Sequence, residues 1–478
     1  MRAGDEARID GDTAAHRARV DAVATAVARA AHATTPAHIA KGGVHHVVPL
    51  PTDQRFSGTR VDTSALCNIV SIDLVARRAV AEPGVTFEQL VRATLPHGLA
   101  PAVVPELRGI TVGGAVAGCS IESMSWRLGG FHDSCTAYEV VTGDGRVLRV
   151  GRADPWAPAQ HADLFEALHG SYGTLGVLTE VTFDLVPAGP LVEVTYDHHR
   201  SFESFRAALV RACERTDGGE PAHGHQLVDA IVHGPDHYVL CLGRFRDHAG
   251  RQPSDYSGVG IYHRSTARLA QDLLTTEDYF FRYDTECHWL TATVPPLEWP
   301  VVRRLGGRWL LGSTNLITLS NRVAPIQRRI LRRPDLVCDV FIPADRFEEF
   351  FDWYAVTFDF WPLWVVPYRP RTIYPWIGPS VRAALGHDPG EQQGDPDVLF
   401  IDAAIYGAPN RDPHRDLSVE LEEKVFELGG LKTLIGRNHY SSERFWQTYD
   451  RPSYEKAKAE LDPTGLFPDL YDKLGRVD

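Results

Sequence analysis

Residues 111–125 have the sequence Thr-Val-Gly-Gly-Ala-Val-Ala-Gly-Cys-Ser-Ile-Glu-Ser-Met-Ser, in which Gly113, Gly114 and Gly118 lie close together. Glycine has no side chain to keep a diphosphate away from backbone N–H groups. In residues 170–187, Gly-Ser-Tyr-Gly-Thr-Leu-Gly precedes an alternating apolar and polar run that is typical of a strand. A glycine loop alone is weak evidence, but the two segments together predict a phosphate-binding loop and the closing strand of one domain.

Short elements are expected around these segments. Residues 136–142 and 146–150 predict a hairpin across Gly143-Asp144-Gly145. Thr86 is expected to open a helix over residues 87–95, and Ala-rich residues 13–33 predict an amphipathic surface helix. The alternation of the closing strand places five residues on one face: Val177, Thr179, Val181, Phe183 and Leu185.

A boundary is expected at Pro187-Ala-Gly-Pro190, because proline and glycine interrupt regular structure. Strands dominate before it, and helices alternate with strands after it. We therefore predict an α+β fold of two domains. Its parts are an N-terminal helix in residues 1–35, a cofactor domain in 36–187, a substrate domain in 188–440, and a helical segment in 441–478 that packs back on the cofactor domain.

Composition excludes several classes of protein. The 478 residues, 44% hydrophobic and 23% charged, are typical of a folded protein with two or more domains. A net charge of −13 argues against a nucleic-acid partner. Seven scattered cysteines without a C-x-x-C pair indicate free thiols in a reducing cytosol. With no signal peptide and no long apolar run, we expect a cytoplasmic protein.

Residues 299–334 have the opposite charge to the rest of the chain, with eight arginines and no Asp or Glu. One interpretation is a solvated basic face that pairs with acidic neighbours. The other is a surface, from Arg303 to Arg333, that contacts anionic lipid or an acidic partner at the inner face of a membrane.

Several familiar motifs are absent from the sequence. It has no G-x-G-x-x-G and no G-x-x-x-x-G-K-[ST], which disfavours Rossmann and P-loop nucleotide binding. His223, His225, His233 and His237 have no Cys or carboxylate at ligand spacing, so no metal site is expected.

Blocks over about residues 40–475 carry a family resemblance. In the first domain they are residues 61–64 through 72–73, 82–86, 111–125, 129–131 and 173–176. These blocks resemble the FAD domain of the vanillyl-alcohol-oxidase (PCMH-type) flavoproteins. Further blocks are similar to the Δ24-sterol reductases of the diminuto type and their bacterial relatives: residues 105–107, 118–123, 135–139, 361–367, 401–407, 445–446 and 468–473.

The resemblance implies FAD, held noncovalently by the first domain. The residues that it places along the cofactor are Gly42, Gly43, His45, Thr111, Gly113, Gly114, Gly118, Ser120, Glu122, Ser123, Ser125, Gly129, Phe131, Gly173, Gly176 and Val177. His45 lies where covalently flavinylated relatives have Arg-Gly-Gly-Gly-His. It would therefore link to the flavin or be an ordinary loop histidine.

Residues 350–376 contain eleven aromatic residues, and their prolines forbid one continuous helix. We expect an irregular apolar wall that suits a hydrocarbon ligand and stabilises positive charge. The alternative is ordinary core packing. The expected substrate contacts are Trp353, Phe358, Trp361, Trp364 and Tyr368.

The family's reaction implies reduction of an isolated C=C bond in a lipid, either a methylene-branched fatty acyl chain or a sterol-like side chain. It combines protonation with hydride from reduced flavin, and NADPH or NADH is the expected electron donor. The candidate catalytic residues are Glu122, Tyr406, Arg437, His439 and Tyr440.

Two alternatives stay open. Residues 437–440, Arg-Asn-His-Tyr, resemble the Arg-Pro-His-Trp motif of sugar-lactone and alditol oxidases, which favours an alcohol or sugar oxidase or dehydrogenase. The third hypothesis is a flavin-loaded subunit that acts as partner of another enzyme, such as a lipid methyltransferase.

Overall fold

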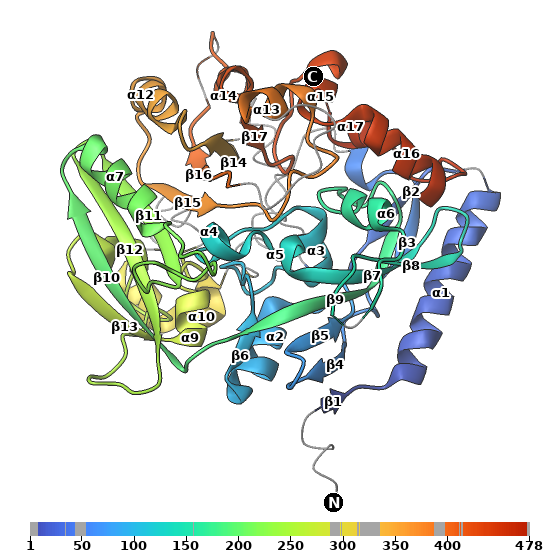
Figure 1. The fold of residues 1–478 in the computed structure, drawn as a ribbon, viewed down its shortest axis with the longest axis horizontal. Helices are drawn as coiled ribbons and strands as arrows, with labels where there is room; N and C mark the ends of the chain where they lie inside the picture. The colour runs from blue at the N-terminus through green and yellow to red at the C-terminus, as the bar shows by residue number, and fades with distance from the viewer. Residues whose placement is uncertain are drawn as a thin grey trace, which may run out of the picture.

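The fold is built around two antiparallel sheets that lie side by side (Figure 1). The structure is a computed structural model. It describes residues 8–33, 35–43, 54–155, 157–286, 297, 299–312, 315, 335–386, 397–410, 412 and 414–475. Helices and strands are both abundant in it, so the protein is an α+β protein, as predicted.

The first sheet has the strand order β1-β4-β5-β9-β7-β8, and β6 also pairs with β9. The strands are β1 (Arg8–Asp10), β4 (Ile69–Asp73), β5 (Arg78–Ala81), β6 (Leu99–Pro101), β7 (Cys135–Val141), β8 (Val147–Gly151) and β9 (Val177–Pro187). The hairpin β7–β8 is confirmed. The predicted face of β9 is also confirmed, because Val177, Thr179, Val181, Phe183 and Leu185 are all buried.

The second sheet begins at Leu191, directly after β9 ends at Pro187. Its order is β13-β10-β12-β11-β15-β16-β14-β17. The strands are β10 (Leu191–His199), β11 (Leu227–Gly234), β12 (His237–Arg246), β13 (Gln271–Thr275), β14 (Leu336–Pro343), β15 (Leu363–Tyr368), β16 (Phe400–Ala408) and β17 (Leu431–Lys432).

The two faces of the second sheet pack differently. Helices α7 (Phe202–Ala212), α12 (Phe347–Thr357) and α14 (Leu417–Glu427) cover its outer face in one hydrophobic core. Its inner face shares a second core with the first sheet. In β16, Ile401 and Ala403 belong to the outer core, whereas Phe400 and Ala404 belong to the inner one. Side chains that alternate along these central strands therefore face the first sheet.

Shorter elements complete the fold. Strands β2 (Ala37–Ala40) and β3 (Thr59–Asp62) form a separate parallel pair. The helices of the first part are α2 (Phe87–Thr94), α3 (Val112–Ala117), α4 (Ser125–Leu128), α5 (Phe131–Ser134) and α6 (Ala162–Ala167). Those of the second are α8 (Tyr262–Thr266), α9 (Thr276–Phe280), α10 (Pro300–Leu311) and α13 (Pro379–Ala384). Thr86 opens α2, as predicted, through a capping box with Gln89.

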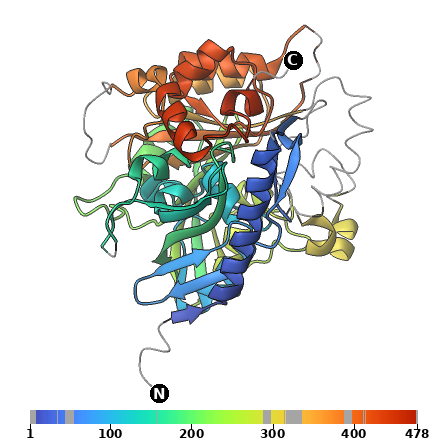
Figure 2. The same ribbon diagram turned by 90° about the vertical axis from the view of Figure 1, so that its right-hand side faces the viewer.

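Helix α1 (Thr13–His32) confirms the predicted N-terminal helix, and it lies along the first sheet (Figure 2). Its buried stripe of valines packs against Leu466 and Phe467 near the C-terminus. At its first turns, His16 and Arg19 each hold the buried Glu82 at 2.8 Å. The same carboxylate accepts hydrogen bonds from the main chain and the side chain of Asn68.

The C-terminal helices α15 (Ser442–Thr448), α16 (Arg451–Leu461) and α17 (Leu470–Leu474) also contact the first part of the chain. Lys458 donates a hydrogen bond to the carbonyl oxygen of Thr174 at 2.6 Å. Lys473 donates one to the carbonyl oxygen of Tyr172 at 2.7 Å. The glycine turn before β9 is therefore held by the end of the chain.

The aromatic segment 350–376 is more regular than expected. Its first part lies in α12, and residues 363–368 form β15 in the middle of the second sheet. The prediction of an irregular wall is wrong, because the prolines end the helix without preventing a strand from following it.

Replacing Glu82 with alanine is expected to lower the free energy of unfolding by about 3 kcal/mol, because His16 and Arg19 would lose a buried partner. Burial alone would raise the pKa of Glu82, but hydrogen bonds from His16, Asn68 and Arg19 lower it. This stabilisation is therefore present at neutral pH and is lost as the pH falls through the folded-state pKa. Urea unfolding measures the change. Glu193→Ala, at an exposed pair with Arg246, is the control and is expected to change stability little.

Candidate functional site

Three segments converge at the carboxyl ends of β2 and β3. These strands are parallel, so Lys41-Gly42-Gly43 and Thr63-Ser64 leave them at the same end. A Cβ atom placed on Gly42 would lie 3.0 Å from Ser64 Cβ, and one on Gly43 would lie 3.7 Å from Thr111 Cγ2. A Cβ atom placed on Gly114 would lie 4.0 Å from Lys41 Nζ. We call residues 41–43, 63–64 and 111–114 the cradle.

The three glycines of the predicted phosphate loop have different roles. A Cβ on Gly113 would lie 2.6 Å from Pro83, and the Gly113 N–H is donated to the Pro83 carbonyl oxygen. The Gly118 N–H is donated to the carbonyl oxygen of Gly114. Neither N–H group is free for a diphosphate. The prediction that Gly113 and Gly118 offer their N–H groups to the cofactor is therefore corrected. Gly114 differs, because its N–H makes only a long contact of 3.4 Å, with Thr111 Oγ1.

Lys41 is the cation of the cradle. It is largely buried and has no partner among the described residues. Burial lowers the pKa of Lys41 to about 8. A partly buried cation without a protein partner, beside a glycine, is suited to an anion. Lys41 was not singled out in the sequence analysis. Its position directly before Gly42-Gly43 was the available signal.

A buried charge network lies farther along the same loop. Glu122, which follows α3, forms an ion pair with Arg282 at 2.7 Å. Arg282 forms a second one with Asp229 of β11 at 3.0 Å. Trp364 of β15 donates to Asp229 at 2.9 Å, and the Arg282 guanidinium lies 4.3 Å from the ring centroid of Tyr279. The network therefore joins the loop after α3 to the second sheet.

Both carboxylate oxygens of Glu122 are engaged. Oε1 contacts Arg282, and Oε2 accepts hydrogen bonds from the backbone N–H and the hydroxyl of Ser123. Burial raises the pKa of Glu122 to about 7, although Arg282 acts in the opposite direction. The Ser125 hydroxyl accepts a hydrogen bond from the Glu122 N–H. Glu122, Ser123 and Ser125 thus fix the loop, and this geometry favours a positioning role for Glu122 over proton donation.

A second acidic group lies on the inner face of the second sheet. Asp402 of β16 is 1% exposed, and its Oδ1 atom has no hydrogen-bond partner in the described part of the chain. Its cross-strand neighbours are the apolar residues Phe341 and Val366. Burial raises the pKa of Asp402 well above its usual value, and the nearby Asp339 and Glu106 add to the effect. Burial and these neighbouring carboxylates therefore favour the protonated form of Asp402.

Tyr406 lies on the same strand, and its hydroxyl donates a hydrogen bond to Asp339 of β14. Asp339 also accepts one from the Thr433 hydroxyl, at 3.2 Å. Of the predicted catalytic residues, Tyr406 is thus the one beside Asp402. Sequence reasoning missed Asp402 as a candidate. A lone carboxylate within the apolar strand Phe-Ile-Asp-Ala-Ala-Ile (400–405) was the available signal.

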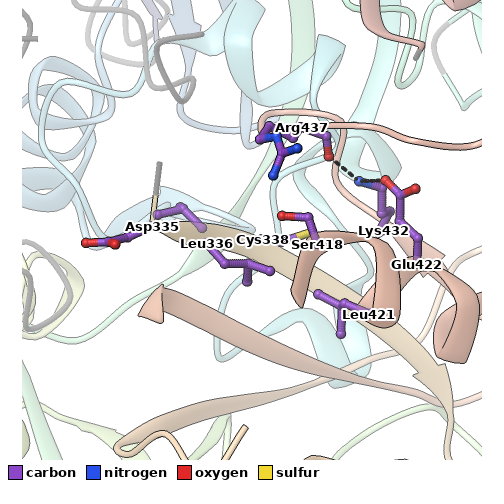
Figure 3. A pocket seen from close by; sticks show the side chains of 10 residues that line it. Asp335, Leu336, Cys338, Ser418, Leu421, Glu422, Lys432 and Arg437 are labelled. Atoms are coloured by element: carbon purple, nitrogen blue, oxygen red, sulfur yellow. Dashed lines mark hydrogen bonds and ion pairs between the residues drawn. The ribbon is translucent and has the colours of Figure 1, made fainter. Parts of the chain in front are cut away.

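Another predicted catalytic residue, Arg437, lies near α14 together with Glu422 and Lys432 (Figure 3). Arg437 forms two ion-pair contacts with Asp416, at 2.8 and 3.0 Å. The His439 N–H and the Tyr440 hydroxyl both donate to Glu422, whose carboxylate also pairs with Lys432 at 2.8 Å. A cavity of about 20 Å³, which is room for one water molecule, separates α14 from β14 here. The Arg437 guanidinium and the Tyr440 hydroxyl therefore have structural partners, which argues against proton donation by these two groups. The His439 imidazole is not engaged in this way, because its buried Nε2 atom has no hydrogen-bond partner in the described part of the chain, so its catalytic role stays a prediction.

The predicted substrate residues are divided between the two faces of the second sheet. Trp353, Phe358 and Trp361 pack with α12 in the outer core. Trp364 and Tyr368 lie in β15 and belong to the inner core. For Trp353, Phe358 and Trp361, the alternative of ordinary core packing is therefore the correct one.

The first part of the chain matches a known protein family. Residues 15–151 match the family model described as the FAD binding domain, and they include the cradle. This part of the chain is therefore an FAD-binding domain. The resemblance noted in the sequence is confirmed at this level.

Relatives cover most of the chain. It is 27% identical over 424 residues to the Delta(24)-sterol reductase of Homo sapiens, a match that spans 86% of this chain and 76% of the relative. The Caenorhabditis elegans homolog is 24% identical over 438 residues, spanning 88% and 79%. The decaprenylphosphoryl-beta-D-ribose oxidase of Mycolicibacterium smegmatis is 36% identical over 135 residues, 28% of each chain.

The residues of the cradle fit the anionic cofactor. Lys41 offers a half-buried cation with no partner among the described residues, and the Gly114 Cα and the Thr111 hydroxyl lie beside its Nζ atom. Gly173 lies near the cradle, since a Cβ on it would meet Ile39 of β2 at 2.8 Å. His45 lies outside the described residues.

Other residues expected along FAD make contacts within the protein. Phe131 packs on Phe87 and Phe183, and Val177 is buried in a core. Gly129 and Gly176 closely approach Asp133 and Val140. The carbonyl oxygen of Ser120 accepts the Phe131 N–H.

Two features are absent from the described residues. No group of three His, Cys, Asp or Glu residues in these ranges is placed to hold a metal. No helix in the same part of the chain has the length and apolar character needed to cross a bilayer.

Replacing Lys41 with methionine is expected to raise the dissociation constant of FAD about tenfold to a hundredfold, since a charge-assisted contact contributes about 1.5–3 kcal/mol. A bound anion favours the protonated form of Lys41, whose pKa without the anion is about 8. The FAD affinity of the unmodified protein should therefore be highest below pH 8 and fall as the pH rises through 8. Fluorescence titration of the apoprotein with FAD measures both effects. Lys456→Met, at an exposed lysine, is the control. An unchanged pH dependence in Lys41→Met would contradict this role.

Proposed function

We propose that the protein reduces an isolated C=C bond of a lipid, with NADPH or NADH as the source of electrons. In this proposal the first sheet and its helices bind FAD, noncovalently, and the second sheet presents the substrate site. Relatives named as sterol reductases over 86% of the chain support the reaction class. The substrate is either a methylene-branched fatty acyl chain or a sterol-like side chain.

The observation that carries the proposal is the buried carboxyl group of Asp402, whose Oδ1 atom has no partner in the described part of the chain and which lies in apolar surroundings on the face toward the FAD-binding domain. An isolated alkene has no carbonyl group to polarise it, so a proton must reach one carbon before or with the hydride. A buried carboxyl group that is protonated at pH 7 can donate that proton. We therefore propose Asp402 as the proton donor.

The surroundings of Asp402 suit a developing positive charge. Protonation of the less substituted carbon leaves cationic character on the other carbon, and aromatic faces attract cations. Trp364, Tyr368 and Phe341 supply such faces on the inner side of the second sheet. When bound and reduced, FAD would supply the hydride that forms the second new C–H bond. The apolar wall excludes water, which would otherwise capture the cation.

A second candidate is an alcohol or sugar oxidase or dehydrogenase, in which the hydride flows to FAD. The identity of 36% with an oxidase over 135 residues favours it. The motif at 437–440 supports it less, because the Arg437 side chain is paired with Asp416.

Anaerobic flavin spectra separate the two candidates. We expect NADPH or NADH to bleach the bound flavin, and a lipid extract with methylene-branched or sterol-like alkenes to restore its colour. Bleaching by a sugar or an alcohol, with none by either nicotinamide cofactor, would exclude the reductase. Mass spectrometry of the lipids should show a gain of two hydrogen atoms.

Replacing Asp402 with asparagine is expected to slow reoxidation by the alkene about 10²–10⁴-fold, because the proton donor is lost. Bleaching by the nicotinamide cofactor should be unchanged. In the unmodified protein the reoxidation rate should fall as the pH rises through the raised pKa of Asp402. Asp197→Asn, on β10 and paired with His199, is the control. Equal reoxidation rates in Asp402→Asn and the control would exclude Asp402 as the donor.

A further inference from the structure

Helix α10 carries an exposed apolar surface. The exposed fractions of Trp299, Val301 and Leu305 are 59%, 67% and 84%. Most other exposed large apolar residues of the described ranges are isolated, whereas these three lie within seven positions. Figure 2 shows α10 projecting from the body of the molecule, away from the first sheet. Clustered apolar exposure of this kind marks an interaction surface.

The orientation of α10 is fixed from its other side. Arg303 is 1% exposed and donates hydrogen bonds to the carbonyl oxygens of Gly258, at 3.1 Å, and Gly260, at 2.9 Å. Val301 and Leu305 are four residues apart and therefore share one face of the helix. The buried guanidinium thus keeps Trp299, Val301 and Leu305 directed outward. Arg303 itself is not part of the exposed surface, which corrects the sequence expectation that began the contact segment at this residue.

The charge around this surface selects its partner. Arg304 is exposed on α10, and residues 299–334 contain eight arginines and no acidic residue. The whole chain carries a net charge of −13, so its average field would repel an anionic membrane. In sequence, the arginine-rich residues 299–334 have the opposite charge to the rest of the chain. Arginine combined with exposed Trp, Val and Leu is typical of a helix that lies in a lipid interface.

We propose that Trp299, Val301, Leu305 and Arg304 dock the protein on an anionic lipid bilayer. The apolar side chains would enter the boundary between headgroups and acyl chains, while the arginine contacts lipid phosphate. This docking is independent of the reaction at Asp402. It would bring an enzyme that acts on lipids to the phase in which they reside.

The test is flotation of the full-length protein, loaded with FAD, with vesicles of phosphatidylcholine and phosphatidylglycerol or of phosphatidylcholine alone. The variant is Val301→Glu/Leu305→Glu. Val356→Glu is the matched control, since Val356 is 86% exposed on α12. We expect binding to the anionic vesicles that weakens with salt and falls at least about tenfold in the double variant, because two apolar side chains no longer enter the lipid. The control should bind like the unmodified protein.

Three outcomes would overturn the proposal. The first is that the unmodified protein floats with neither vesicle, and the second is that Val356→Glu loses binding as strongly as the double variant. The third is that the double variant changes the sedimentation of the protein without changing flotation, which would make α10 a contact between copies of the chain. An unchanged flavin spectrum and unfolding midpoint show that the variants are folded.

Discussion

The ion pairs of Arg282 with Glu122 and Asp229 hold the two halves of the molecule together. All three side chains are fully or almost fully buried, so each would be costly without the others. Glu122 belongs to the loop that follows the cradle, and Asp229 belongs to the second sheet. The network therefore fixes the distance between the part that binds FAD and the sheet that faces it. Aromatic rings around Arg282 exclude water and strengthen these contacts.

Much of the fold follows from local sequence patterns. Alternation identified β9 and the β7–β8 hairpin, and the Pro187–Pro190 segment lies where one sheet ends and the other begins. The structure of segment 350–376 was harder to predict, because its aromatic density and its prolines are compatible with an irregular wall and also with the observed helix and strand. The strand order of the second sheet depends on pairings between distant segments, which no local pattern contains.

The site was predicted less completely than the fold. A glycine in the loop before Ser125 looks the same in the sequence whatever its role in the structure. Gly114 lies beside Lys41 in the cradle, whereas Gly113 is needed because Pro83 packs closely against it. Arg437 and His439 have chemistry suited to catalysis, but their partners on α14 are known only from the structure. The role of Asp402 depends on which face of β16 points inward. That in turn depends on the packing of both sheets.

The contacts of Lys458 and Lys473 with the turn at Tyr172–Thr174 have a consequence for biosynthesis. Residues near the end of the chain hold a turn that a ribosome completes long before them. The first sheet can form its strands early, yet this turn gains its two lysine contacts only after residues up to 473 have emerged. Since Gly173 lies beside β2 and the cradle, a nascent chain that stops before Lys458 would lack the contacts that hold this side of the cradle.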